Sequence, residues 1–210
     1  MRLETARLVI RSFEAHDAEP WIALVNDPEV GRFTPPSPPA TLETFHGALA
    51  RRQTMERERG FEDAIAKEFP QIQIVQKQYG MSDRSKAMAA AENILTAHPN
   101  LDGIFGSTEP SSIGTALALK SRGLAGKVKF VAFDAAEGMI EDLKNGTIDA
   151  LVAQDPFRIG YEAVRTLVDK LNGKTPPKRI DLSAHVITKA DLDKPEIKAL
   201  LNPDVKKYLQ

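Results

Sequence analysis

The sequence contains no cysteine among its 210 residues. This absence excludes disulfide bonds, thiol nucleophiles and thiolate metal ligands, although it does not decide the compartment. No apolar run is long enough to span a bilayer. The N-terminal stretch MRLETARLVIRSFE has neither the uninterrupted apolar region nor the cleavage site of a secretory signal. We therefore expect the chain as written to be cytoplasmic.

Motifs of enzymatic chemistry are also missing. The sequence has no GxGxxG, GxxxxGKS/T or GxSxG pattern, so phosphate cradles and a serine nucleophile elbow have no support. Its four histidines are scattered without HxH or HxxxH spacing, which disfavours a histidine metal site. Net charge is −1, with no basic stripe for nucleic acid. We expect a protein that is not an enzyme and needs no cofactor or metal.

Lysine is absent from the first part of the chain. Residues 1–60 contain eight arginines and no lysine, whereas residues 61–210 contain fifteen lysines and five arginines. Since the two cations are nearly equivalent on solvated surfaces, this contrast indicates two origins joined near residues 57–61. Chance or local helix preference is the alternative.

What is present is a regular alternation of strands and helices after Pro70. Short apolar runs predict strands, and apolar stripes at helical spacing predict helices. The expected strands are residues 72–75, 101–105, 128–133, 148–152 and 180–187. The expected helices are residues 83–98, 111–123, 137–145 and 159–171. This succession predicts an α/β fold with an open, mostly parallel sheet and helices on both faces, a Rossmann-like or flavodoxin-like three-layer lobe.

The part before Pro70 is less regular. Residues 6–13 predict a strand, residues 17–25 a helix, and the proline-rich residues 34–41 an extended loop. A helix then begins near Thr41 and continues towards residue 69. The polar tail, residues 191–210, is expected to pack loosely.

Polar residues follow the predicted strands. Ligands of open α/β sheets bind outside the carboxyl ends of the strands, and carboxylates and amides suit polyol hydroxyls. The residues found there are Asp83, Thr108, Glu109, Asp134 and Gln154. Asp134 could instead cap a helix starting at Ala135, and Gln154 could bond a neighbouring loop. The sequence leaves both alternatives open.

Residues from 57 onward resemble the second half of a type I periplasmic sugar-binding protein of the ribose-binding class. The segments that carry the resemblance are RERGF (57–61), AHPNLDGIF (97–105), VAFD (131–134) and AQDPFxIG (153–160). The resemblance implies two lobes closing over a sugar in an ABC-type transport system. It assigns a ring-oxygen clamp to Arg57 and hydroxyl binding to Asp134 and Gln154.

The same resemblance covers the remaining candidates. Thr108 stands where the family often has asparagine, followed by an acid as at Glu109, and Phe133 precedes the key aspartate. Ser82 replaces an aromatic that stacks on the sugar in some members, which weakens an assignment to ribose itself.

Residues 2–55 resemble the start of a GNAT acetyltransferase, through LETARLVIR (3–11), Asp17-Ala18 and NDPEV (26–30). The pyrophosphate-binding loop of that family is absent, so the resemblance implies no catalysis. We expect domains at 1–56, 57–190 and 191–210. The first lobe and the strand before Arg57 are missing, so residues 6–13 are predicted to enter the sheet in its place.

The expected function is sugar binding, weakened because one lobe is present. A recombined or engineered chimera without native activity is the first alternative, and an acetyltransferase fragment is the second. A monosaccharide, an ABC permease and a second copy of the chain are the expected partners, without nucleic acid or membrane insertion.

Overall fold

The computed structural model describes residues 2–4, 9–11, 23, 42–177 and 179–204, with side chains described essentially from residue 54 onward. The chain divides into two compact units, Met1–Pro70 with Lys206–Gln210, and Gln71–Val205. The predicted helix at 17–25 and the proline-rich loop at 34–41 lie outside the described residues, apart from Ala23.

The first unit contains a small sheet and a long helix. Strand β1 (Arg2–Glu4) pairs antiparallel with β2 (Val9–Arg11), and Leu3 lies opposite Ile10. The prediction that this segment enters the parallel sheet is therefore wrong for Val9–Arg11. A partner only a few residues away closes a short loop, which costs less entropy than a distant one. Helix α3 (Leu42–Glu68) confirms the predicted helix that continues through residues 57–61.

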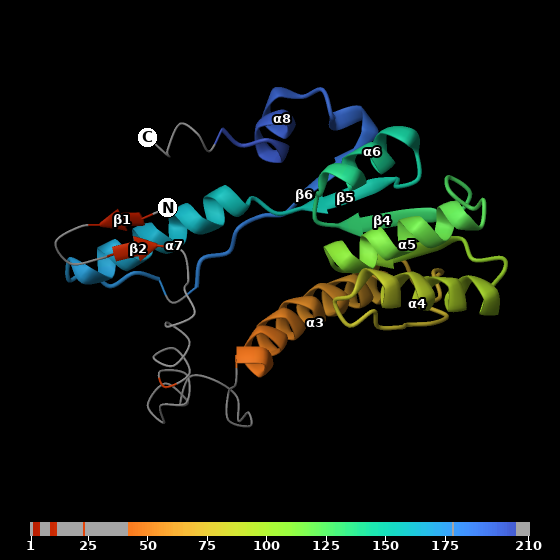
Figure 1. Ribbon diagram of the computed structural model, residues 1–210, viewed down its shortest axis with the longest axis horizontal. Coiled ribbons are helices and arrows are strands. Elements are labelled where there is room, and N and C mark those ends of the chain that lie inside the picture. Colours follow the sequence, from red (N-terminus) through yellow and green to blue (C-terminus); the bar gives the residue numbers. More distant parts are fainter. Residues whose placement is uncertain (1, 5–8, 12–22, 24–41, 178, 205–210) are drawn as a thin grey trace. The chain divides into compact units, whose positions relative to one another are not determined.

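The second unit is built on a four-stranded sheet in the order β3-β4-β5-β6. Its strands are β3 (Gly103–Gly106), β4 (Lys129–Phe133), β5 (Ala150–Ala153) and β6 (His185–Thr188). The first three are parallel and β6 is antiparallel to β5. The predicted α/β class with an open, mostly parallel sheet is confirmed (Figure 1).

Residues 72–75 do not form the predicted strand. Ile72, Ile74 and Val75 are instead 48%, 37% and 43% exposed. An alternating pattern favours a strand, but a strand forms only where a neighbour accepts its backbone hydrogen bonds. The correction also means that Asp83 does not follow a strand end.

The helices of the second unit begin and end at capping residues. Helix α4 (Arg84–Ala97) starts after the N-cap Asp83, and α5 (Glu109–Ser121) starts after Thr108. Helix α6 (Glu137–Asn145) ends at Gly146, whose φ of 84° suits glycine. These three and α7 (Pro156–Leu171) confirm the helix predictions to within a few residues.

One face of the sheet forms the core with α4, α5 and α6. Phe130, Leu151 and Ile187, on three neighbouring strands, are fully buried in it. Helices α4 and α5 pack so closely that a Cβ on Gly114 would come within 2.6 Å of the Met88 nitrogen. Small residues at this crossing therefore set the distance between the two helices.

The C-terminal segment corrects a prediction. A 3-10 turn, η2 (Lys189–Asp191), leads to α8 (Pro195–Leu201), and Ile197 of α8 is buried in the core. Loose packing of the tail from residue 191 is therefore wrong for the described part, because its apolar residues complete the core. No helix within the described residues has the length and apolar character needed to cross a membrane.

Candidate functional site

The candidate site lies at the carboxyl edge of β3, β4 and β5. Gly106 pairs with Ala132, and Phe133 pairs with Val152, so the three parallel strands end at the same edge. The residues that follow them are therefore neighbours, as the sequence predicts.

Asp134 has the most unusual backbone at this edge. Its φ is 73°, in the left-handed region that non-glycine residues rarely occupy and that aspartate tolerates better than most. Its N–H donates to the Val152 carbonyl at 3.0 Å, which pins the turn to the end of β5. The geometry thus orients one carboxylate at the cost of local backbone strain.

The Asp134 carboxylate lies at the start of α5. Its Oδ2 accepts a hydrogen bond from the Glu109 backbone N–H at 3.1 Å. Helix α6 begins later, at Glu137, and its N-cap Ala136 makes no side-chain capping bond. The alternative that Asp134 caps a helix starting at Ala135 is therefore wrong. The carboxylate instead benefits from the partial positive charge of the α5 N-terminus.

Thr108 is the N-cap of α5. Its Oγ1 accepts from the Ser111 N–H at 3.4 Å and lies 2.9 Å from the Ser111 hydroxyl. Beside it, the Glu109 carboxylate pairs with the Arg84 guanidinium at 2.7 Å. Both of these side chains are substantially exposed, so the pair contributes little stability, but it balances one of the two acids at the edge.

Among the described residues, Asp83 makes no side-chain hydrogen bond or ion pair with the carboxyl edge of the sheet, but the next residue, Arg84, does. Its Oδ1 accepts from the Lys86 N–H at 2.8 Å, which makes it the N-cap of α4. The next residue, Arg84, is the one that reaches Glu109. The structure therefore supports a structural role for Asp83 and introduces Arg84 as a residue that the sequence prediction missed.

Ser112 is a second residue that the sequence prediction did not single out. It is fully buried, its Oγ accepts from the Phe133 N–H at 3.1 Å, and it lies 3.3 and 3.2 Å from the Gly106 and Phe133 carbonyls. One hydroxyl thereby ties the ends of β3 and β4 to α5. A serine on the core side of a predicted helix is the signal that could have found it.

The remaining candidates differ in placement. Phe133 is only 8% exposed, and its backbone carries the bond to Ser112. Gln154 is exposed and lies between β5 and Asp155, the N-cap of α7. Arg57 is half-buried within α3, in the first unit. Its participation in one site with Asp134 stays a prediction.

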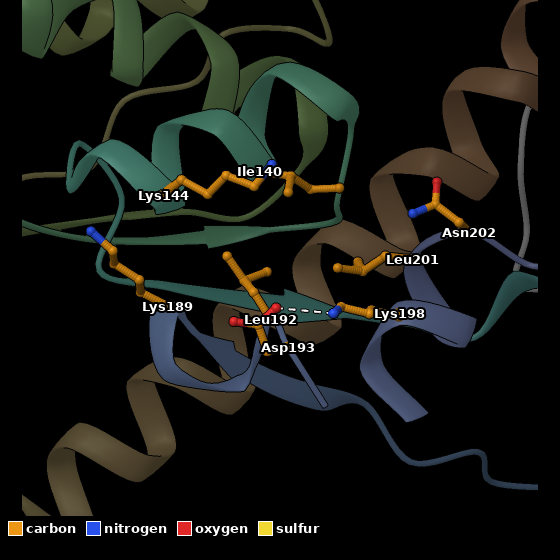
Figure 2. A pocket seen from close by; sticks show the side chains of 8 residues that line it. All are labelled: Ile140, Lys144, Lys189, Leu192, Asp193, Lys198, Leu201 and Asn202. Atoms are coloured by element: carbon orange, nitrogen blue, oxygen red, sulfur yellow. Dashed lines mark ion pairs between the residues drawn. The ribbon is translucent and has the colours of Figure 1, made fainter. Parts of the chain in front are cut away.

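A separate hollow lies away from this edge, between α6, η2 and α8. Its volume is about 580 Å³, and Figure 2 shows apolar side chains facing one another with lysines around them. Its lining residues are Ile140, Lys144, Lys189, Leu192, Asp193, Lys198, Leu201 and Asn202. Asp193 and Lys198 pair across it at 2.9 Å. None of the predicted site residues lines this hollow. Within the described part of the chain, no group of three acidic, histidine or cysteine side chains is placed to hold a metal ion.

Comparison with known proteins decides the family. Residues 30–175, well over half of the chain, match the family described as periplasmic binding protein domain. The chain belongs to the periplasmic binding protein family. The match begins before the join expected at residues 57–61, so the family comparison does not reproduce that boundary.

Curated relatives of this periplasmic binding protein domain are named for sugars. The ribose import binding protein of Bacillus subtilis is 33% identical over 141 residues, which cover 67% of this chain and 44% of that protein. The D-allose-binding periplasmic protein of Escherichia coli is 33% identical over 112 residues, 53% of this chain and 36% of that protein. The chain thus spans about half the length, or less, of the curated relatives it matches.

Solved structures agree with the fold of this binding-protein domain. A solute-binding protein of an ABC transporter from Agrobacterium vitis, bound to α-D-tagatopyranose, superposes with a TM-score of 0.68 at 32% identity. The match covers 72% of this chain and 50% of that one. A second solute-binding protein from the same organism, bound to D-fucose, gives 0.66 at 37% identity and covers 70% and 50%.

Proposed function

We propose that this chain is one sugar-binding lobe of a solute-binding protein of an ABC transporter. The observation that carries the proposal is the strained Asp134, which holds a carboxylate at the carboxyl edge of the sheet beside the α5 N-terminus. Relatives named for ribose and allose import, and structures with bound monosaccharides, support a sugar as the ligand.

In this proposal Asp134 accepts hydrogen bonds from sugar hydroxyls, and Gln154, on the next strand end, both accepts and donates. The Glu109 and Arg84 pair flanks them and limits the net negative charge of the edge. Arg57 is proposed to reach the ring oxygens. The lobe binds without catalysing a reaction, and a permease of the ABC type is its proposed membrane partner.

One lobe supplies about half of a closed cleft, and ligand pockets normally bury 70–90% of a small molecule. We therefore expect a dissociation constant in the millimolar range, which corresponds to a binding free energy of about −4 kcal/mol. Isothermal titration calorimetry with ribose, allose and arabinose measures it. Absence of saturable heat up to tens of millimolar sugar would refute sugar binding by this chain.

Substitutions assign the binding to the proposed edge. Asp134→Asn and Gln154→Ala are expected to weaken binding about tenfold each, because each removes one or two hydrogen bonds to hydroxyls. Glu141→Gln is the matched control, since Glu141 lies on α6 and pairs only locally with Lys144 at 2.6 Å. Arg57→Ala is also expected to weaken sugar binding, and its control is Arg59→Ala, because Arg59 is an exposed arginine on the same helix. Equal losses in variants and controls would place the binding elsewhere.

We further propose that the N-terminal segment has a separate origin and contributes no chemistry. The absence of lysine from residues 1–60 supports this. An acetyl-CoA titration followed by calorimetry is expected to show no saturable binding. A saturable signal would instead favour an acetyltransferase-related function.

A further inference from the structure

Helix α7 carries an apolar stripe that its own unit does not cover. No residue of α7 is buried. The stripe, which consists of Tyr161, Val164, Leu167, Val168 and Leu171, recurs at the three- and four-residue spacing of one helical face. These side chains are between 42% and 59% exposed.

The opposite side of α7 is polar and holds its own ion pairs. Arg165 pairs with Glu162 at 2.7 Å, and Lys174, just beyond the helix, pairs with Asp169 at 2.7 Å. The helix is therefore amphipathic, and its uncharged face is the one that can be buried without desolvating a charge.

The sheet of the same unit has a matching apolar surface on β5 and β6. Its core face contains Leu151 and Ile187, which are fully buried. On the other face, Val152 and Val186 lie directly opposite each other in the antiparallel pair. Val186 is 67% exposed. The helix α7 and the β5–β6 pair thus each have an exposed apolar face, and the two faces can pack against each other.

We propose that two copies of this chain form a dimer in which α7 of each copy covers the β5–β6 face of the other. The connections suit such an exchange. Only Gln154 and Asp155 join β5 to α7, and short hinges favour exchange of an element between copies. After α7, residues 172–184 provide a long return to β6.

The area is sufficient for a stable pair. Five large apolar side chains at these exposures present roughly 400 Å² per stripe, within the range of a functional surface patch. Two-fold symmetry makes each contact occur twice. The two stripes together bury roughly 800 Å², and the two sheet faces that they cover lose a similar area. The dimer therefore buries on the order of 1,600 Å², the standard size of a specific interface.

The test uses the absence of native cysteine, since each introduced cysteine is unique. Equal amounts of the full-length Val168→Cys and Val186→Cys proteins are mixed, unfolded and refolded together, and treated with a short bismaleimide. The exchange predicts a crosslink between the two different chains. Lys170→Cys, which lies on α7 away from the stripe, replaces Val168→Cys in the control and is expected to crosslink at least fivefold less.

Two crosslinking results overturn the proposal. One is a Val168→Cys/Val186→Cys double variant that crosslinks within single chains, which means that α7 closes on its own sheet. The other is a monomeric mass by light scattering at 100 µM together with no crosslink between chains. Sedimentation adds a quantitative measure, because Val168→Lys is expected to raise the dimer dissociation constant at least tenfold and Lys170→Ala to leave it within twofold. Equal effects of the two variants count against the stripe.

Discussion

The backbone strain at Asp134 leads to a prediction with an unusual order of stabilities. The residue has a φ of 73°, and its Oδ2 accepts a hydrogen bond of 3.1 Å from the Glu109 N–H. Left-handed backbone costs a residue with a Cβ about 1 kcal/mol or more, and glycine almost nothing. Because the site is partly exposed, we take the hydrogen bond as contributing about 1 kcal/mol.

These two contributions separate three substitutions. Asp134→Ala loses the bond and keeps the strain, so we expect a loss of about 1–2 kcal/mol in the free energy of unfolding. Asp134→Gly loses the same bond but relieves the strain, so its loss is expected to be about 1 kcal/mol smaller. Asp134→Asn keeps an acceptor oxygen and tolerates the left-handed region, so it is expected to stay within about 0.5–1 kcal/mol of the wild type.

Urea denaturation followed by far-UV circular dichroism measures the series. Sugar binding should weaken in all three variants, whereas stability should fall in the order asparagine, glycine, alanine. If alanine and glycine are equally stable, the strain is not present in solution. If the alanine variant is as stable as the wild type, the bond to Glu109 contributes nothing and the site is not built as described.

Three further predictions concern the scaffold. Ser112→Ala should lower the free energy of unfolding by about 1–3 kcal/mol, because a buried backbone N–H loses its partner, whereas Ser121→Ala, whose hydroxyl bonds only within α5, should change it by less than about 0.5 kcal/mol. Gly114→Ala should destabilise by about 1–3 kcal/mol, since the new methyl group would meet the α4 backbone, whereas Gly138→Ala, with nothing within 4 Å, should be neutral or stabilising by up to about 1 kcal/mol. Thermal melts compare the melting temperatures of each variant and its control, and equal temperatures within a pair would contradict the contacts of Ser112 or Gly114. Hydrogen bonds from a lysine and a threonine lower the pKa of Asp191, so the stability it adds is present above about pH 4 and is lost as pH falls below that value. The gap between the wild type and Asp191→Asn should therefore close in acid, and a gap that is constant from pH 7 to pH 2 would contradict this assignment.

Much of the fold could be predicted because its signals are local. Helix α4 begins after Asp83, whose side chain caps it, and helix α6 ends at Gly146, whose left-handed backbone suits glycine. The strands of the parallel sheet are short apolar runs between such helices, which is typical of strands covered by helices. The prediction of a strand at residues 72–75 was wrong, because an alternating sequence pattern does not show whether a neighbouring strand is available for hydrogen bonding.

The candidate site was predictable only in part. The rule that ligands bind at the carboxyl edge pointed to Thr108, Glu109, Asp134 and Gln154, which follow the ends of the three parallel strands. That they bind a ligand stays a prediction. The rule could not show that Asp134 bonds to the start of α5, since that contact joins residues 25 positions apart. The role of Ser112 was hidden for the same reason.

The sequence by itself determined the class of the protein, because helix caps, apolar periods and the order of elements are properties of neighbouring residues. Only the tertiary structure decided that β6 runs antiparallel, that the tail completes the core through Ile197, and that the stripe of α7 stays uncovered. Each of these three features depends on which surfaces, distant in the sequence, contact one another. The sequence pattern indicates only which surfaces are apolar. The physical reason is that burial is collective, whereas capping and periodicity are local.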